Sequence, residues 1–110
     1  MTVDLAAARL ISSDVAGETL EPDGASTELA TASRALSAFG EVEVGLWEAG
    51  PGTDVDTEAD EVFIVLSGAG RVDFSDGSGI ELAPGVVVRL HAGDRTTWTI
   101  TERLRKLYVA

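Results

Sequence analysis

The sequence contains no cysteine, and its 110 residues include a single histidine and a single lysine. Disulfide bonds and thiolate metal sites are therefore excluded, and one imidazole cannot build a site that needs two histidines. No apolar stretch approaches the roughly 18 residues of a membrane-spanning helix. The N-terminus also lacks the basic start of a signal peptide. These absences predict a cytoplasmic protein without a membrane partner.

Basic residues are scarce, and the formal net charge is −11. Between Asp14 and Glu61 thirteen acidic residues stand against one base, Arg34. Such a negative field repels polyanions, so nucleic acid is not an expected partner. The acidity either serves solubility, or some of the carboxylates line a site for a cation or an amine. Both interpretations are open at the level of sequence.

The chain has the length of one domain, and its pattern is typical of β-structure. From residue 41 onward, stretches of alternating polarity are separated by turns such as DGSG at 76–79 and PG at 84–85. Six or seven short strands of this kind predict an all-β sandwich or barrel. Residues 1–40 are less regular, and we expect them to pack on or extend a barrel core of residues 41–110. The expected strands are 41–49, 61–67, 70–75, 80–83, 86–90, 96–101 and 104–109.

A family resemblance begins in the segment GTDVDTEADEVFIVLSG, residues 52–68. It is similar to the first cupin motif, G-x5-H-x-H-x3/4-E-x6-G, with Glu61 and Gly68 at the motif's separation. Asp54 and Asp56 stand where the family has two histidines, and a shift of one residue would bring Glu58 in place of Asp56. The polar run TDVDTEAD could equally be a solvated loop.

The second half of the chain continues the resemblance. GVVVRLHAG at 85–93 keeps the spacing of the second cupin motif, with His91 at a proline position and Thr96 at the position of a ligand histidine. We expect His91 in a surface turn. The closing TTWTITERLRKLYV is similar to the ureidoglycine aminohydrolase-like branch of cupins. The resemblance spans roughly residues 40–110 and implies a double-stranded β-helix, or jelly-roll, barrel.

The resemblance also implies where a metal would bind. Cupin metalloenzymes generally use two histidines, one glutamate and a further histidine inside the barrel, and the positional equivalents here are Asp54, Asp56, Glu61 and Thr96. Carboxylates suit hard cations such as Mn rather than Fe, Ni or Cu. Without a cation, neighbouring carboxylates repel one another. The alternatives are a degenerate site with no cofactor, or a weak site for a divalent cation.

Alternation in the strands predicts which side chains share a face, and the cupin resemblance implies that the face with Glu61 lines the barrel interior. Glu61 and Phe63 share one face of their strand, Trp98 lies on the Ile100 face, and Lys106 and Tyr108 share a face with Leu104. We therefore expect a pocket lined by Glu61, Phe63, Trp98, Lys106 and Tyr108.

Glu61 begins an apolar strand, and its environment decides its charge. A carboxylate at the rim of an apolar cavity has a raised pKa unless a cation pairs with it. Arg71 and Arg89 on neighbouring strands are candidate partners. Lys106 is the only lysine, and its amine could keep a buried carboxylate ionised, bind a substrate carboxylate, or lie on the surface.

Two functions follow from these expectations. The first is a single-domain cupin that binds a small polar metabolite inside the barrel and has a degenerate metal site. The alternative is a metal-dependent enzyme of nitrogen or small-metabolite chemistry, a ureidoglycine aminohydrolase-like hydrolase that uses carboxylate ligands. Whether the protein is an enzyme stays open. Single barrels of this size usually pair, so we also expect a homodimer.

Overall fold

The computed structural model describes residues 9–110; residues 1–8, which include the start examined for a signal peptide, lie outside this range. The described chain is all-β and forms one eight-stranded sheet that folds over on itself. None of its segments is a helix able to cross a membrane. The strands are β1 (Glu21–Pro22), β2 (Ala32–Phe39), β3 (Val42–Ala49), β4 (Gly52–Thr57), β5 (Glu61–Phe74), β6 (Gly79–Leu82), β7 (Val87–Leu90) and β8 (Arg95–Val109).

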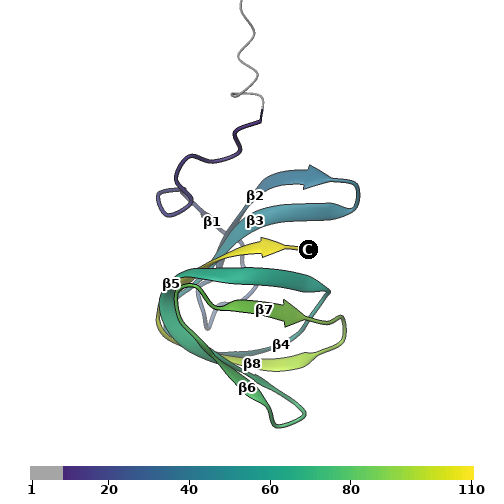
Figure 1. The fold of residues 1–110 in the computed structure, drawn as a ribbon. Helices are drawn as coiled ribbons and strands as arrows, with labels where there is room; N and C mark the ends of the chain where they lie inside the picture. The colour runs from purple at the N-terminus through teal and green to yellow at the C-terminus, as the bar shows by residue number, and fades with distance from the viewer. Residues whose placement is uncertain (1–8) are drawn as a thin grey trace, which may run out of the picture.

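Two long strands, β5 and β8, join the two layers of the barrel (Figure 1). They have 14 and 15 residues and pair antiparallel from Val62–Val109 to Phe74–Thr96. One half of the pair is extended by β3, β2 and β1 beside β8 and by β7 beside β5. The other half is extended by β4 beside β8 and by β6 beside β5. The predicted all-β jelly-roll barrel is confirmed.

Each long strand was expected as two short ones, 61–67 with 70–75 and 96–101 with 104–109. Both are continuous because the β5–β8 register shifts three times between Val65 and Gly70, which bends the pair without a turn. At the bend, Gly68 has a φ of 89°, and a Cβ atom there would clash with the Arg103 carbonyl. Only glycine fits this position.

Within the described residues before position 41, β1 and β2 extend the sheet of the barrel. Residues 28–39 show a weak helical composition, yet β2 begins at Ala32 and pairs antiparallel with β3. The polar run after Gly52 is also a strand: β4 pairs with β8, so Asp54 lies opposite Trp98 and Asp56 opposite Thr96. As far as Thr57 this run is therefore a strand and not a loop, although most of its side chains are exposed.

The core lies between the two layers. Its members are the inward-facing apolar side chains of the strands together with Leu29, and the largest of them are less than 5% exposed. The buried core residues include Leu29, Ala49, Phe63, Val65, Val72, Leu82, Val88, Leu90, Trp98, Ile100 and Leu104.

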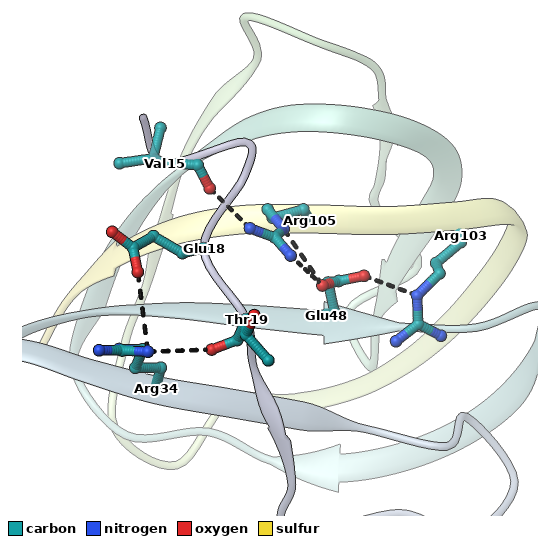
Figure 2. A network of polar contacts seen from close by, with 7 residues as sticks. All are labelled: Val15, Glu18, Thr19, Arg34, Glu48, Arg103 and Arg105. Atoms are coloured by element: carbon teal, nitrogen blue, oxygen red, sulfur yellow. Dashed lines mark hydrogen bonds and ion pairs between the residues drawn. The ribbon is translucent and has the colours of Figure 1, made fainter. Parts of the chain in front are cut away.

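An arginine–glutamate network ties the irregular N-terminal segment to the outside of the barrel (Figure 2). Glu48 on β3 accepts hydrogen bonds from Arg105 Nε and Nη2 at 3.1 and 2.5 Å and from Arg103 Nε at 2.6 Å. Arg105 also donates to the Val15 carbonyl at 2.6 Å. Burial alone would raise the pKa of Glu48, but the hydrogen bonds and charges of the two arginines lower it below its usual value.

A second contact of the same kind lies next to this network. Arg34 on β2 donates to the Thr19 carbonyl at 3.3 Å, and its guanidinium lies 3.7 Å from the Glu18 carboxylate. Figure 2 shows residues 15–19 crossing the strands that carry these arginines. Leu46, on the same face of β3 as Glu48, is fully buried. Residues 15–19 are thus held on the barrel by hydrogen bonds from Arg105 and Arg34 and by the ion pair of Glu18 with Arg34.

The network predicts a pH-dependent loss of stability in Glu48→Gln. We expect the free energy of unfolding to fall by roughly 1.5–3 kcal/mol at pH 7, because Arg105 loses its charged acceptor. The folded-state pKa of Glu48 lies below its unfolded value of 4.5, so this stabilisation is present above pH 4.5 and is lost as the pH falls through the folded value. Urea denaturation at pH 7 and below pH 4 measures both effects.

Glu81→Gln is the matched control. Glu81 pairs with Arg71 in the same chemistry, but its side chain is 76% exposed. An exposed pair of this kind contributes about 0–1 kcal/mol. Equal losses in the two variants would show that the Glu48 network does not anchor the N-terminal segment.

Candidate functional site

A pocket of about 330 Å³ opens into the barrel at the side where β2, β3, β4 and β8 meet the segment before β2. Its wall is mixed. The acids that border it are Asp23, Asp54, Asp56, Glu58 and Glu61; the hydroxyl groups are those of Ser26, Thr31 and Ser33; the aromatic rings are those of Trp47, Trp98 and Tyr108; and the one basic side chain is Lys106.

Lys106 lies at the inner end of this wall and is 5% exposed. Its Nζ atom is 2.6 Å from Glu61 Oε2. Three aromatic rings surround the same ammonium group, with centroids 4.7 Å away in Trp47, 4.4 Å in Phe63 and 4.9 Å in Trp98. Each distance is within the roughly 6 Å range of cation–π attraction, which strengthens in a site that excludes water.

Strand register explains why these groups meet. Lys106 on β8 lies directly opposite Trp47 on β3 and opposite Val65 on β5, so the side chains of the three strands share the inner face. Trp98 contacts both other rings, at centroid distances of 5.5 Å to Trp47 and 5.7 Å to Phe63. Phe63 is 1% exposed and packs beneath the ammonium as part of the core.

Neither arginine that was a candidate partner of Glu61 pairs with it. Arg71 binds Asp73 and Glu81, and Arg89 binds Asp60 at 3.0 Å. Arg89 lies opposite Val62, on the outer face of the sheet, and Arg71 lies beyond the bend of β5 in the other layer. Neither guanidinium therefore reaches the Glu61 carboxylate, and Lys106 pairs with it instead.

Tyr108 borders the pocket beside this pair, as expected from its alternation with Lys106. Its hydroxyl donates a hydrogen bond to Glu43 Oε2 at 2.7 Å. The ring lies over Gly45, where a Cβ atom would clash with the phenol. Burial, followed by the hydrogen bond to Glu43, raises the pKa of the Tyr108 phenol above its usual value.

The acids near the mouth are held by backbone and hydroxyl donors. Ser26 Oγ donates to Asp54 Oδ2 at 2.6 Å, and this bond lowers the pKa of Asp54. Asp23 accepts a hydrogen bond from Thr31 Oγ1 at 2.6 Å. Burial alone would raise the pKa of Asp23, but its hydrogen bonds, led by that from Thr31, lower it. These bonds fix the carboxylates in place without neutralising them.

Glu58 is the most perturbed acid of the pocket. Burial, a hydrogen bond with Asp56 and the negative charge of Asp56 raise its pKa to about 8, Glu61 adds to the rise, and Lys106 opposes it. The sequence pointed to Glu58 only as an alternative to Asp56 in the motif. It did not point to Trp47, Asp23, Ser26 or Ser33, because the signal that groups them is the register of strands and segments remote in the chain.

The metal site implied by the cupin resemblance does not fit these residues. Glu61 is bound to an ammonium group, Asp54 is held by Ser26, and the buried Thr96 hydroxyl lies 3.5 Å from the Asp56 carbonyl oxygen. His91 lies in an exposed turn, as expected, with a side chain 66% exposed. Within residues 9–110 no three acidic or imidazole side chains form a group able to hold a metal ion.

Residues 36–108 match the family model of the EutQ-like cupin domain. The chain belongs to this cupin family. No curated protein matches it. The membership accounts for the barrel.

Solved structures share the fold. EutQ of Salmonella typhimurium, named for ethanolamine utilization, has a TM-score of 0.64 at 21% identity, over 73% of this chain and 68% of that one. Ectoine synthase from P. lautus has a TM-score of 0.67 at 17% identity, over 76% of this chain and 64% of its own. A Rhizobium leguminosarum protein of unknown function has a TM-score of 0.66 at 26% identity, over 79% and 84%.

Glu58 predicts how the stability of this cupin depends on pH. Its pKa is about 8 in the folded state and 4.5 as a free group, so between these values the folded chain holds a proton that the unfolded chain releases. The contribution of Glu58 to stability therefore falls as pH rises from 4.5 to 8. We expect Glu58→Gln, which cannot ionise, to become steadily more stable than the wild type across this range.

Chemical denaturation at intervals from pH 5 to pH 9 measures this difference. Glu102→Gln, at an exposed position of β8, is the control and should follow the wild-type profile. A Glu58→Gln profile parallel to that of the wild type would contradict the raised pKa of Glu58.

Proposed function

We propose that this cupin binds a small polar metabolite in the pocket and does so without a metal ion. The observation that carries the proposal is the composition of the pocket: an aromatic floor, a buried Lys106–Glu61 pair, and carboxylates and hydroxyls near the mouth. Ligand sites generally combine apolar walls with a few fixed polar groups in this way.

The size and charge of the pocket narrow the range of ligands that it could bind. About 330 Å³ is near the lower end of the roughly 300–1,000 Å³ range of small-molecule sites. The single ammonium group is engaged by Glu61, so it does not neutralise Asp54 or Asp56. A ligand that carries an amine therefore gains from the field of the pocket, and a carboxylate ligand is repelled. We expect amines and amino alcohols to bind better than acids of the same size.

The alternative, a metal-dependent hydrolase of the ureidoglycine aminohydrolase-like branch, rests on the similarity of the chain's closing segment. It requires Asp54, Asp56 and Glu61 to bind one cation such as Mn. The described residues offer no such group, and Glu61 already has a cationic partner. We therefore place metabolite binding first. The cytoplasmic location and the absence of a nucleic-acid partner stay predictions.

A thermal-shift panel tests the binding proposal. The panel contains primary amines and diamines, amino acids, carboxylates and neutral sugars of comparable size, each titrated against the metal-free wild-type protein. We expect at least one cationic compound to raise the melting temperature in a saturable manner, because it binds only the folded state.

Two serines of β2 provide matched variants for this experiment. Ser33→Leu places a larger side chain in the wall of the pocket, whereas Ser37→Leu changes the same strand away from it. The ligand-induced rise should be lost in the first variant and kept in the second. A rise that survives Ser33→Leu unchanged would place the ligand elsewhere and contradict the proposal.

We also propose that the protein forms a homodimer through the outer face of the layer that contains β5, β7 and β8. Val62 and Val109 are directly paired, and Val87 lies opposite Ile64 on the same face. Val62, Val87 and Val109 are 39%, 62% and 38% exposed. Contiguous exposed valines on a sheet face are typical of a surface that a second copy covers.

Light scattering at micromolar concentration should return the mass of two chains. Val87→Lys should give the mass of one chain, because it places a charge in the apolar face. Val55→Lys is the control, since Val55 is 71% exposed but lies on β4 in the other layer. A wild-type mass of one chain would reject the homodimer.

A further inference from the structure

We propose that the ammonium group of Lys106 is the permanent cation of this barrel and takes the place of the metal ion that the first cupin motif would otherwise bind. The motif glutamate, Glu61, is present, and a cation does lie against it at 2.6 Å. That cation belongs to the chain itself. The inference uses the same pocket as the proposed function but does not depend on which metabolite binds there.

The surroundings of Lys106 suit an ammonium group and not a divalent metal. Three aromatic rings face Nζ at 4.4–4.9 Å, and one carboxylate oxygen completes its contacts. Aromatic faces attract a monovalent organic cation, whereas hard divalent metals require about six oxygen ligands. Trp47, Phe63 and Trp98 offer no oxygen at all. The cage formed by these three rings therefore favours an organic ammonium group over a divalent metal ion.

The position of Lys106 is fixed by the fold. The residue lies between the fully buried Leu104 and the half-buried Tyr108 on the inner face of β8, and its main chain pairs with β3 on one side and β5 on the other. Its side chain is 6% exposed. A lysine enclosed between two strands in this way is a built-in element of the barrel interior.

The arrangement has a consequence for the pocket. A second cation at Glu61 would meet the Lys106 ammonium at close range and be repelled, so the pair excludes a metal from the motif position. The charge at the base of the pocket then does not depend on metal supply. Lys106 acts here as a positioning residue, because its contact at 2.6 Å holds the Glu61 carboxylate in one place.

Chemical rescue of Lys106→Ala tests the assignment. The variant keeps the three rings and Glu61 but loses three methylene groups and the ammonium, which n-propylammonium supplies together. We expect the melting temperature of Lys106→Ala to fall, and n-propylammonium chloride to recover a large part of the loss in a saturable manner. Sodium chloride at the same ionic strength and n-propanol should not recover it.

Controls separate the cage from general salt effects. Arg103→Ala removes an exposed cation from the same strand and should gain no more from n-propylammonium than the wild-type protein does. The wild-type protein should show no rise with Mn²⁺ or Zn²⁺ and no stoichiometric metal on elemental analysis. Rescue by n-propanol or sodium chloride equal to that by n-propylammonium, or stoichiometric metal in the wild type, would overturn the proposal.

A second route applies where Lys106→Ala does not fold. Lys106→Met keeps most of the side-chain volume without the charge, and Glu61→Gln removes the opposite charge. In a double-mutant cycle the two losses in stability should be strongly non-additive, because either change alone leaves an unpaired buried charge. Additive losses would overturn the proposal. A panel ligand that binds the wild type while rescue fails would retain the proposed function and reject Lys106 as the barrel's cation.

Discussion

The pairing of β5 with β8 is the interaction on which the rest of the barrel depends. Every other strand except β1 and β2 is bonded to one of these two, and β2 and β1 follow through β3. The same pairing builds the site, since it sets Phe63 opposite Tyr108 and Val65 opposite Lys106. A slip of one residue would turn Lys106 to the outer face and leave Glu61 without a cation. Fold and site therefore share one register.

The buried ammonium is an unusual choice for a core. Moving an ion out of water costs several kcal/mol even after relaxation, and an apolar pair in the same volume is often as stable or more so. Glu61 and three aromatic rings offset the cost for Lys106, but they do not explain why a charge is there. Stability alone does not require it. Lys106 lies in the wall of the pocket, so the proposed ligand would bind next to its charge.

The sequence pattern within each strand was enough to predict which side chains share a face, but not which side chains of other strands they contact. Alternation correctly turned Phe63, Trp98 and Lys106 inward, because the period of two is a property of each strand alone. The partner of Glu61 lies 45 residues away and depends on the register of two bent strands, which no short segment encodes. Motif spacing likewise located Glu61 but left open whether a metal binds there, since the same spacing shapes the strand whether or not a metal binds.

The pocket accounts for part of the acidity of the chain. Solubility accounts for acids that face water, but five of the carboxylates border one pocket, and the single lysine there is engaged by Glu61. Burial, a hydrogen bond with Asp56 and the charge of Asp56 raise the pKa of Glu58 to about 8, so Glu58 keeps a proton in this pocket at neutral pH. An incoming cation would take the place of that proton and relieve the repulsion. Under the proposed function, the charge of the ligand rather than the identity of a metal is then the property by which the pocket would select what it binds.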